Sequence, residues 1–168
     1  MDDIIAEAGL SAGAVYSYFK NKEDLIEAAL TTSMNELAGR LQPVWAAGDL
    51  QPPLKLLEAT ATVIEDFARR DGFDLKRIAL LGWAESQRDA KLKGIMQLFY
   101  AAFVARLAEC VVRWKQAGLV APSANDDYLA KALLALLLGY VVEAAVIGGM
   151  DPTIFRQGVE HLVAFSRP

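Results

Sequence analysis

Five residues near the N-terminus are of types suited to contacting a nucleic acid: Ser11, Ala12, Gly13, Tyr16 and Lys22. A glycine at position 13 lets the backbone at a helix N-terminus lie close to a phosphate, where free N–H groups favour an anion. Lys22 is suited to a phosphate contact, Tyr16 to a phosphate or a base edge, and Ala12 to a thymine methyl group. The alternative is that these residues only form a solvated helical face.

The elements that would position these residues are two short helices joined by a tight turn. Gly9 can adopt the positive φ that ends the first helix, and Ser11 is a good N-cap for the second. Val15 and Phe19, four residues apart, predict the inner face of the second helix, and we expect Leu10 to turn inward. This layout is typical of a helix-turn-helix, whose second helix enters the major groove of DNA.

A longer helix is predicted to follow over residues 22–45, with Asn21 as its N-cap. This helix connects the N-terminal head to the rest of the chain. We expect its far end, at Trp45, to meet a ligand cavity and therefore to influence the response to a ligand.

The motif Gly9-Leu10-Ser11-x-Gly13-x-Val15-Tyr16-x-Tyr18-Phe19-x-x-Lys22-Glu23-x-Leu25 resembles the N-terminal signature of TetR-type bacterial transcriptional repressors. The resemblance covers about the first thirty residues. It implies an all-α protein with a helix-turn-helix DNA-binding domain at residues 1–31 and a helical-bundle domain at residues 32–168. The second domain would bind a small-molecule effector and form a homodimer, and the partner of the first would be double-stranded operator DNA.

The beginning of the chain departs from this family, whose members carry a further helix before the helix-turn-helix. Residues 1–33 also hold two basic and six acidic side chains, which accounts for the whole-chain net charge of −4. DNA-binding surfaces are usually basic, because neutralising phosphates supplies most of the non-specific affinity. We therefore expect this chain to bind operator DNA weakly or not at all, and a longer parent chain to bind it well.

Apolar residues recur at helical spacing through the remainder of the chain, without the alternation typical of strands. The uncharged run from Ala132 to Val142 is shorter than the roughly 20 residues that span a bilayer, so we expect a buried helix and no membrane contact. The acidic N-terminus and single cysteine fit a cytoplasmic protein. Further helices are predicted over residues 53–70, 74–86, 89–117, 126–147 and 152–165.

The last two helices carry more apolar surface than one chain can cover. Ala132, Ala135, Gly139 and Val142 predict a face small enough for close helix packing. Phe155, Val159 and Leu162 predict a second strip on the last helix. This surplus of apolar surface indicates that another chain covers it, and the TetR resemblance implies a four-helix dimer interface built from these helices.

Aromatic residues on inward faces could line an apolar cavity for a ligand. The candidates are Trp83, Phe99, Phe103 and Tyr140. For each of them an ordinary place in the core is the alternative interpretation. Glu143 interrupts the most apolar helix, and if it faced the cavity it would favour a cationic or hydrogen-bond-donating ligand. The alternative is an exposed carboxylate near the end of the helix.

The sequence offers little for catalysis. His161 is the only histidine, so a histidine-based metal site or triad is not expected, and Cys110 falls in an apolar stripe typical of core. Residues 9–13 match the letters GxSxG, but no strand precedes them. We therefore expect no enzymatic activity, no cofactor and no metal.

The leading hypothesis is a repressor released from its operator by a small, largely apolar molecule. The alternative is an all-α small-molecule binding or interaction protein with a vestigial head.

Overall fold

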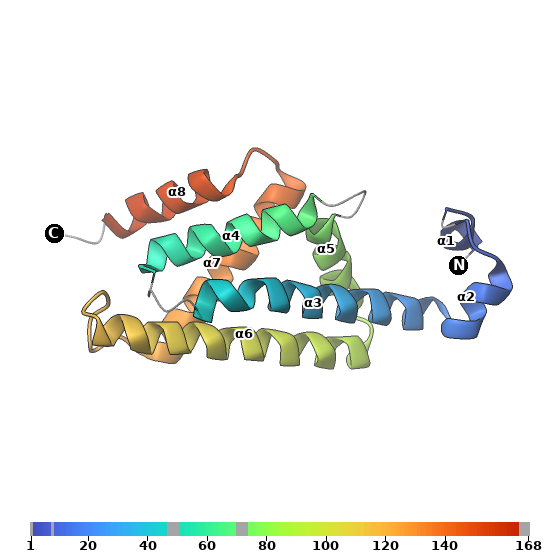
Figure 1. Ribbon diagram of the computed structural model, residues 1–168, viewed down its shortest axis with the longest axis horizontal. Helices are drawn as coiled ribbons and strands as arrows, with labels where there is room; N and C mark the ends of the chain where they lie inside the picture. Colours follow the sequence, from blue (N-terminus) through green and yellow to red (C-terminus); the bar gives the residue numbers. More distant parts are fainter. Residues whose placement is uncertain (1, 8, 47–50, 70–73, 165–168) are drawn as a thin grey trace.

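The computed structural model describes residues 2–7, 9–46, 51–69 and 74–164, and these ranges contain helices and turns but no strand. Figure 1 shows a small head set apart at one end of a helical body, joined to it by one long helix. The helices are α1 (Asp2–Glu7), α2 (Ala12–Tyr18), α3 (Lys22–Ala46), α4 (Pro53–Ala68), α5 (Leu75–Glu85), α6 (Ala90–Gln116), α7 (Asp126–Val146) and α8 (Pro152–Ala164).

The head consists of α1 and α2, and its local geometry follows the sequence closely. Gly9 has a φ of 63°, and Ser11 caps α2 by accepting a hydrogen bond from the Ala14 N–H. Val15 is buried, as predicted. The prediction for Leu10 is wrong: this side chain is 56% exposed, because the turn directs it away from the small interior of the head.

Three hydrogen bonds hold the end of α3 and the residue Gln51 before α4 against α4 and α6. The Trp45 indole donates to Thr60 Oγ1 of α4 at 3.2 Å. From α6, Arg113 donates to the Trp45 carbonyl at 2.6 Å, and the Trp114 indole donates to the Gln51 carbonyl at 2.7 Å. Trp45 and Trp114 also belong to the hydrophobic core, so packing and hydrogen bonding fix the same junction.

Helices α6 and α7 form the most extensive helix pair in the body. By length and composition both are apolar enough to cross a membrane, which is weak evidence because core helices of soluble proteins pass the same test. The buried side of α7 includes Leu133, Leu137 and Tyr140, and these residues join the main core together with Trp114 of α6. The inner faces of the two helices therefore build the core, whereas a large part of their apolar surface stays exposed in the single chain.

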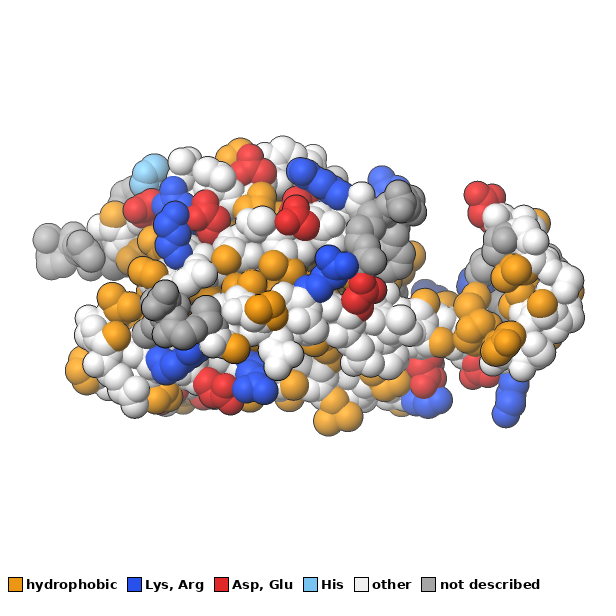
Figure 2. Space-filling view, viewed as in Figure 1, with side chains coloured by type: hydrophobic (Ala, Val, Ile, Leu, Met, Phe, Trp, Pro, Cys, Tyr) orange, Lys and Arg blue, Asp and Glu red, His pale blue; other side chains and the backbone are white. Residues whose placement is uncertain are grey.

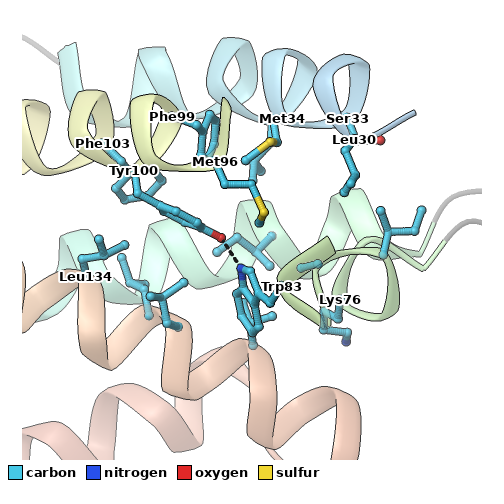
Figure 3. A pocket seen from close by; sticks show the side chains of 17 residues that line it. Leu30, Ser33, Met34, Lys76, Trp83, Met96, Phe99, Tyr100, Phe103 and Leu134 are labelled. Atoms are coloured by element: carbon cyan, nitrogen blue, oxygen red, sulfur yellow. Dashed lines mark hydrogen bonds between the residues drawn. The ribbon is translucent and has the colours of Figure 1, made fainter. Parts of the chain in front are cut away.

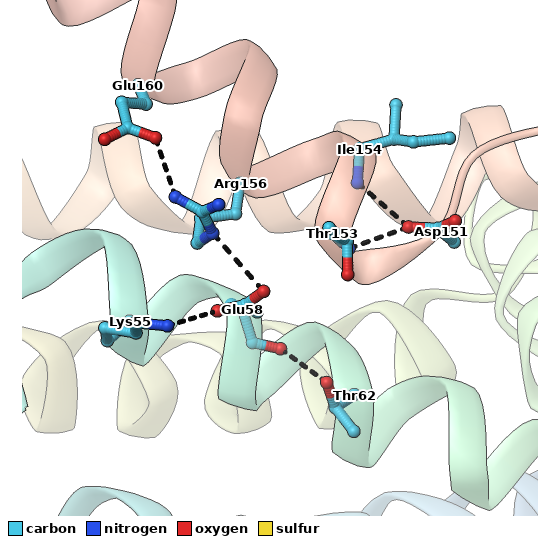
Figure 4. A network of polar contacts seen from close by, with 8 residues as sticks. All are labelled: Lys55, Glu58, Thr62, Asp151, Thr153, Ile154, Arg156 and Glu160. Carbon is cyan, nitrogen blue, oxygen red and sulfur yellow. Dashed lines mark hydrogen bonds and ion pairs between the residues drawn. The ribbon is translucent and has the colours of Figure 1, made fainter.

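Helix α8 lies along α4 and is held there by both apolar and polar contacts. Phe155 and Val159 are buried against the core. Arg156 bridges Glu58 of α4 at 3.3 Å and Glu160 of its own helix at 2.7 Å, as Figure 4 shows. Asp151 caps the helix by accepting from two backbone N–H groups. The prediction that Phe155 and Val159 belong to an outer strip is therefore wrong, since α8 is rotated so that they face inward.

The remaining helix boundaries within the described residues agree with the sequence to within one or two residues. Asn21 is the predicted cap of α3 and accepts from the Asp24 N–H at 2.8 Å, and Gly118 has a φ of 71° after α6. The ends of two predicted helices, at residues 70 and 165, lie outside the described residues.

Candidate functional site

All five candidate DNA contacts lie on the exposed surface of the head. Ala12 and Gly13 form the first turn of α2, and no atom outside the local chain lies within 4 Å of the place where a Cβ on Gly13 would stand. Tyr16 is 48% exposed, and Lys22 begins α3. The arrangement leaves the N-terminus of α2 open to approach by another molecule.

The charge of this surface remains dominated by acidic groups. Asp24 accepts from the Lys20 N–H at 3.2 Å and thereby stabilises the turn before α3. Glu27 pairs with Lys91 of α6 at 2.7 Å, so this carboxylate is held by the body. Figure 2 shows hydrophobic side chains gathered where the head meets the start of α3. Among the described residues of the head, the large exposed apolar side chains are Leu10, Tyr16 and Tyr18.

A cavity of about 70 Å³ lies inside the body, where α3, α5, α6 and α7 meet and Ile64 of α4 closes the wall. Seventeen residues line it, and Figure 3 shows them converging from these helices. Helix α3 contributes Leu30, Ser33, Met34 and Leu37 from its middle turns. The cavity is therefore walled by the same helix that begins at the head.

The lining is almost entirely apolar, and most of its polar groups have partners. Ser33 Oγ donates to the Ala29 carbonyl at 2.7 Å. Lys76 Nζ pairs with Glu65 Oε2 at 2.8 Å, and both side chains are more than four-fifths buried. In Figure 3 the Lys76 ammonium group points away from Met34 and Met96. The lining thus presents no uncompensated charge from these groups.

Trp83 and Tyr100 form a hydrogen bond across the cavity, from α5 to α6. The Trp83 indole N–H donates to the Tyr100 hydroxyl oxygen at 2.7 Å (Figure 3). Burial raises the pKa of Tyr100 above its usual value of 10.0, and the bond from Trp83 lowers it by less. Tyr100 therefore keeps its proton at neutral pH and acts as a neutral hydroxyl.

A second, more open groove of about 770 Å³ adjoins the cavity between α5, α6 and α7. Trp83, Met96, Tyr100 and Leu134 line both spaces. The Trp83–Tyr100 bond therefore stands at the boundary between the inner cavity and the outer groove.

The predicted ligand residues divide into two groups. Trp83, Phe99 and Phe103 line the cavity. Tyr140 does not: it is buried beside Phe155, with ring centroids 5.2 Å apart, and its hydroxyl donates to Glu65 at 3.0 Å. Glu143 is half-buried and lies outside the lining.

Sequence reasoning missed several lining residues, including Leu30, Met34, Met96 and Tyr100. Their signal was present as apolar positions at helical spacing on α3 and α6, but the same signal describes ordinary core. The expectation for Trp45 also differs from the structure: it packs edge-on against Phe103 and lines a separate groove between α3 and α6. The middle of α3, rather than its end, meets the cavity.

The face predicted for close helix packing is exposed along the whole of α7. Tyr128, Val142 and Val146 are exposed at helical intervals, with the small residues Ala132, Ala135 and Gly139 between them. On α8, the side chains of Ile154 and Leu162 are also exposed. A continuous apolar stripe on α7, together with these two residues of α8, therefore remains uncovered in the single chain.

A helix-turn-helix head and a helical body that encloses an apolar cavity together form the all-α arrangement that the resemblance to TetR-type regulators implies. Residues 1–29 match the family model for bacterial regulatory proteins of the tetR family. No curated protein sequence matches the chain significantly. This family match covers the head of the chain, and the fold of the body is compared below with solved structures.

Solved structures share the fold of nearly the whole chain, and two of them are described as transcriptional regulators. Bacillus subtilis FadR, in complex with stearoyl-CoA, is 16% identical, with a TM-score of 0.75 over 96% of this chain and 85% of that one. A putative regulator from Saccharomonospora viridis, in complex with choline, is 20% identical, with a TM-score of 0.76 over 98% and 84%. Salmonella enterica GusR is 20% identical, with a TM-score of 0.69 over 98% and 84%.

Two further expectations concern a metal site and the single cysteine. Within the described ranges, no group of three or more His, Cys, Asp or Glu side chains could hold a metal ion. Cys110 is buried, as its place in the apolar stripe predicted.

Proposed function

We propose that this protein is a cytoplasmic, homodimeric transcriptional repressor that is released from operator DNA by a small, largely apolar molecule. The observation that carries the proposal is the double role of α3. One end of this helix follows directly on α2, which carries the candidate DNA contacts, and its middle turns line the cavity. A molecule in the cavity therefore contacts the helix that sets the position of the head.

A close contact between α5 and α3 supports this coupling. A Cβ at Gly82 would lie only 2.8 Å from Leu30 Cδ2, so the two helices pack with little space between them. Gly82 precedes Trp83, which lines the cavity. A ligand that displaces Trp83 would move Gly82 against Leu30, and through it α3. If the ligand favours a head position that does not fit the operator, DNA binding must weaken reciprocally.

Two copies are needed for this mechanism, because operator half-sites are read by paired heads about one helical turn, ~34 Å, apart. The apolar stripe on α7 and α8 is the surface we assign to the second copy. The ligand-bound structures of the FadR and Saccharomonospora relatives support a ligand-responsive body.

The DNA-binding part is tested by selecting bound sequences from a pool of randomised duplexes at low salt. Phosphate contacts are strongest under these conditions, so the weak binding expected of this acidic head is detectable there. We expect enrichment of a two-fold symmetric sequence. Tyr16→Ala and Lys22→Ala should each weaken binding of the enriched duplex by about tenfold. The control Lys131→Ala changes an exposed lysine of the body and should leave affinity unchanged. If no sequence is enriched, or if all three variants behave alike, the head does not read DNA as proposed.

The release mechanism is tested by filling the cavity without a ligand. Ala79 lines the cavity from α5, and Ala79→Leu adds apolar volume there. We expect this variant to bind the enriched duplex more weakly, although it leaves the head unchanged, whereas Ala90→Leu at the exposed start of α6 should not. Unchanged DNA affinity in a folded Ala79→Leu protein would contradict the coupling through α3.

A further inference from the structure

The Tyr100 hydroxyl is a hydrogen-bond donor of the cavity lining that has no acceptor among the residues that the structure describes. Its oxygen accepts from the Trp83 indole N–H at 2.7 Å. A phenolic hydroxyl both donates and accepts, so its donating capacity is unused in this largely apolar site. Tyr100 is partly buried and also lines the outer groove. A molecule that displaces water from this hydroxyl must supply an acceptor in its place, because a donor buried without one is unfavourable by about 1–3 kcal/mol.

We infer that the effector is an uncharged, mainly apolar molecule with a hydrogen-bond-accepting oxygen, of the carbonyl class, which receives the Tyr100 hydroxyl proton. This inference rests on the proposed function, because it names the chemistry of the molecule that the cavity takes.

The remaining polar groups of the lining argue against a charged effector. Lys76 is neutralised by Glu65, which also accepts from Tyr140 and Arg69. A carboxylate brought into the cavity would have to compete with Glu65 for this lysine. A cation would find no free carboxylate, since Glu143 lies outside the lining. An oxygen acceptor matches the open donor and leaves both existing partnerships intact.

The position of Tyr100 also orients the effector. The Trp83–Tyr100 bond lies where the inner cavity meets the outer groove, and both residues line both spaces. Met34 and Met96 line the inner side in Figure 3. An effector whose oxygen meets Tyr100 therefore places its apolar part among these methionines, where water is replaced by apolar contacts. Any further part of the molecule would extend into the groove.

The test compares three probes of similar size: hexan-2-one, its isosteric alkene 2-methylhex-1-ene, and hexylammonium. Binding is followed by NMR of ¹³C-labelled methionine methyl groups. Met34 and Met96 report on the cavity, and Met150, which does not line it, is the internal control. We expect hexan-2-one and the alkene to shift the signals of Met34 and Met96, and hexylammonium to leave them unchanged.

Two variants isolate the hydrogen bond. Tyr100→Phe removes the donor but frees the Trp83 indole N–H, which can then donate to the ketone. The double variant Trp83→Phe/Tyr100→Phe removes both donors. We expect hexan-2-one to bind the double variant about fivefold more weakly than the native protein, as for loss of one net hydrogen bond, with no loss for the alkene. Tyr128→Phe, at an exposed tyrosine of α7, is the matched control and should change neither affinity.

The infrared carbonyl band of bound hexan-2-one gives a second readout. Hydrogen bonding lowers its frequency, so the band should lie lower in the native protein than in the double variant. If neither apolar probe shifts the NMR signals of Met34 and Met96, the cavity is not the ligand site that the proposed function requires. If both bind and the variants affect ketone and alkene equally, the cavity stands and the carbonyl inference is overturned. Binding of hexylammonium at the cavity would overturn the inference that the effector is uncharged.

Discussion

At the scale of single residues, the most consequential polar group in the body is Glu65. Its Oε2 accepts from Lys76 of α5 at 2.8 Å and from Tyr140 of α7 at 3.0 Å, and Arg69 donates to Oε1 at 3.3 Å. One carboxylate thereby joins three helices beside the cavity. Burial raises its pKa, but the hydrogen bonds and the charges of Lys76 and Arg69 together lower it below the usual 4.5.

The Glu65 network predicts a specific sensitivity to acid. Because the folded pKa lies below the unfolded value, the contribution to stability is complete above about pH 4.5 and is lost as the pH falls through the folded pKa. We expect Glu65→Gln to lower the free energy of unfolding at pH 7 by about 1–3 kcal/mol. At pH 3 the difference from the native protein should shrink.

Urea unfolding at the two pH values measures this effect. Glu109→Gln is the control, because Glu109 forms an exposed pair with Arg106 and should contribute little at either pH. An equal loss for Glu65→Gln at pH 7 and pH 3 would show that the carboxylate charge is not the source of the stabilisation.

At the scale of elements, the head and the body differ in how much they bury. Among the residues of α1 and α2 whose burial is described, Ile5 and Val15 are buried, whereas α4 alone buries six residues, including Leu57, Ile64 and Phe67. Local opening is easiest where few apolar contacts hold a segment. The head should therefore be the least stable part of the described chain.

Hydrogen exchange tests this difference between elements. We expect the amides of α2 to exchange at least about tenfold faster than those of α4 and of the middle of α6, because opening α2 exposes little apolar surface. Binding of the enriched DNA duplex should slow exchange in α2 more than in α4. Equal protection of α2 and α4 in the free protein would contradict this ranking.

At the scale of the whole molecule, the uncovered stripe on α7 predicts the oligomeric state. Ala135 lies near the middle of this stripe and is exposed in the single chain. A symmetric partner would bury it, and an arginine there would place an unpaired charge in an apolar interface. We expect Ala135→Arg to convert a dimer into a folded monomer.

Sedimentation velocity distinguishes the two species. The matched control is Ala90→Arg, which adds the same side chain at the exposed start of α6 and should leave the dimer intact. A native protein that sediments as a monomer, or an Ala135→Arg protein that remains dimeric, would exclude the α7 stripe as the interface.

The sequence by itself determined the elements of this protein and the identity of its head. Helix ends depend on caps and glycine turns within a few residues, so the N-caps Ser11 and Asn21 could be predicted without any tertiary contact. The helix-turn-helix motif is equally local, which is why the family was visible in the first thirty residues. The all-α class followed from apolar periodicity alone.

The tertiary structure decided which faces meet, because helix rotation and crossing depend on contacts between distant residues. Tyr100 meets Trp83 across 17 residues of sequence, and Tyr140 meets Glu65 across 75. A helical period cannot distinguish a side chain that fills the core from one that borders a cavity. The structure therefore placed Tyr140 in the core, Tyr100 at the cavity and Phe155 on the inner face of α8, where sequence alone had no physical means of separating these roles.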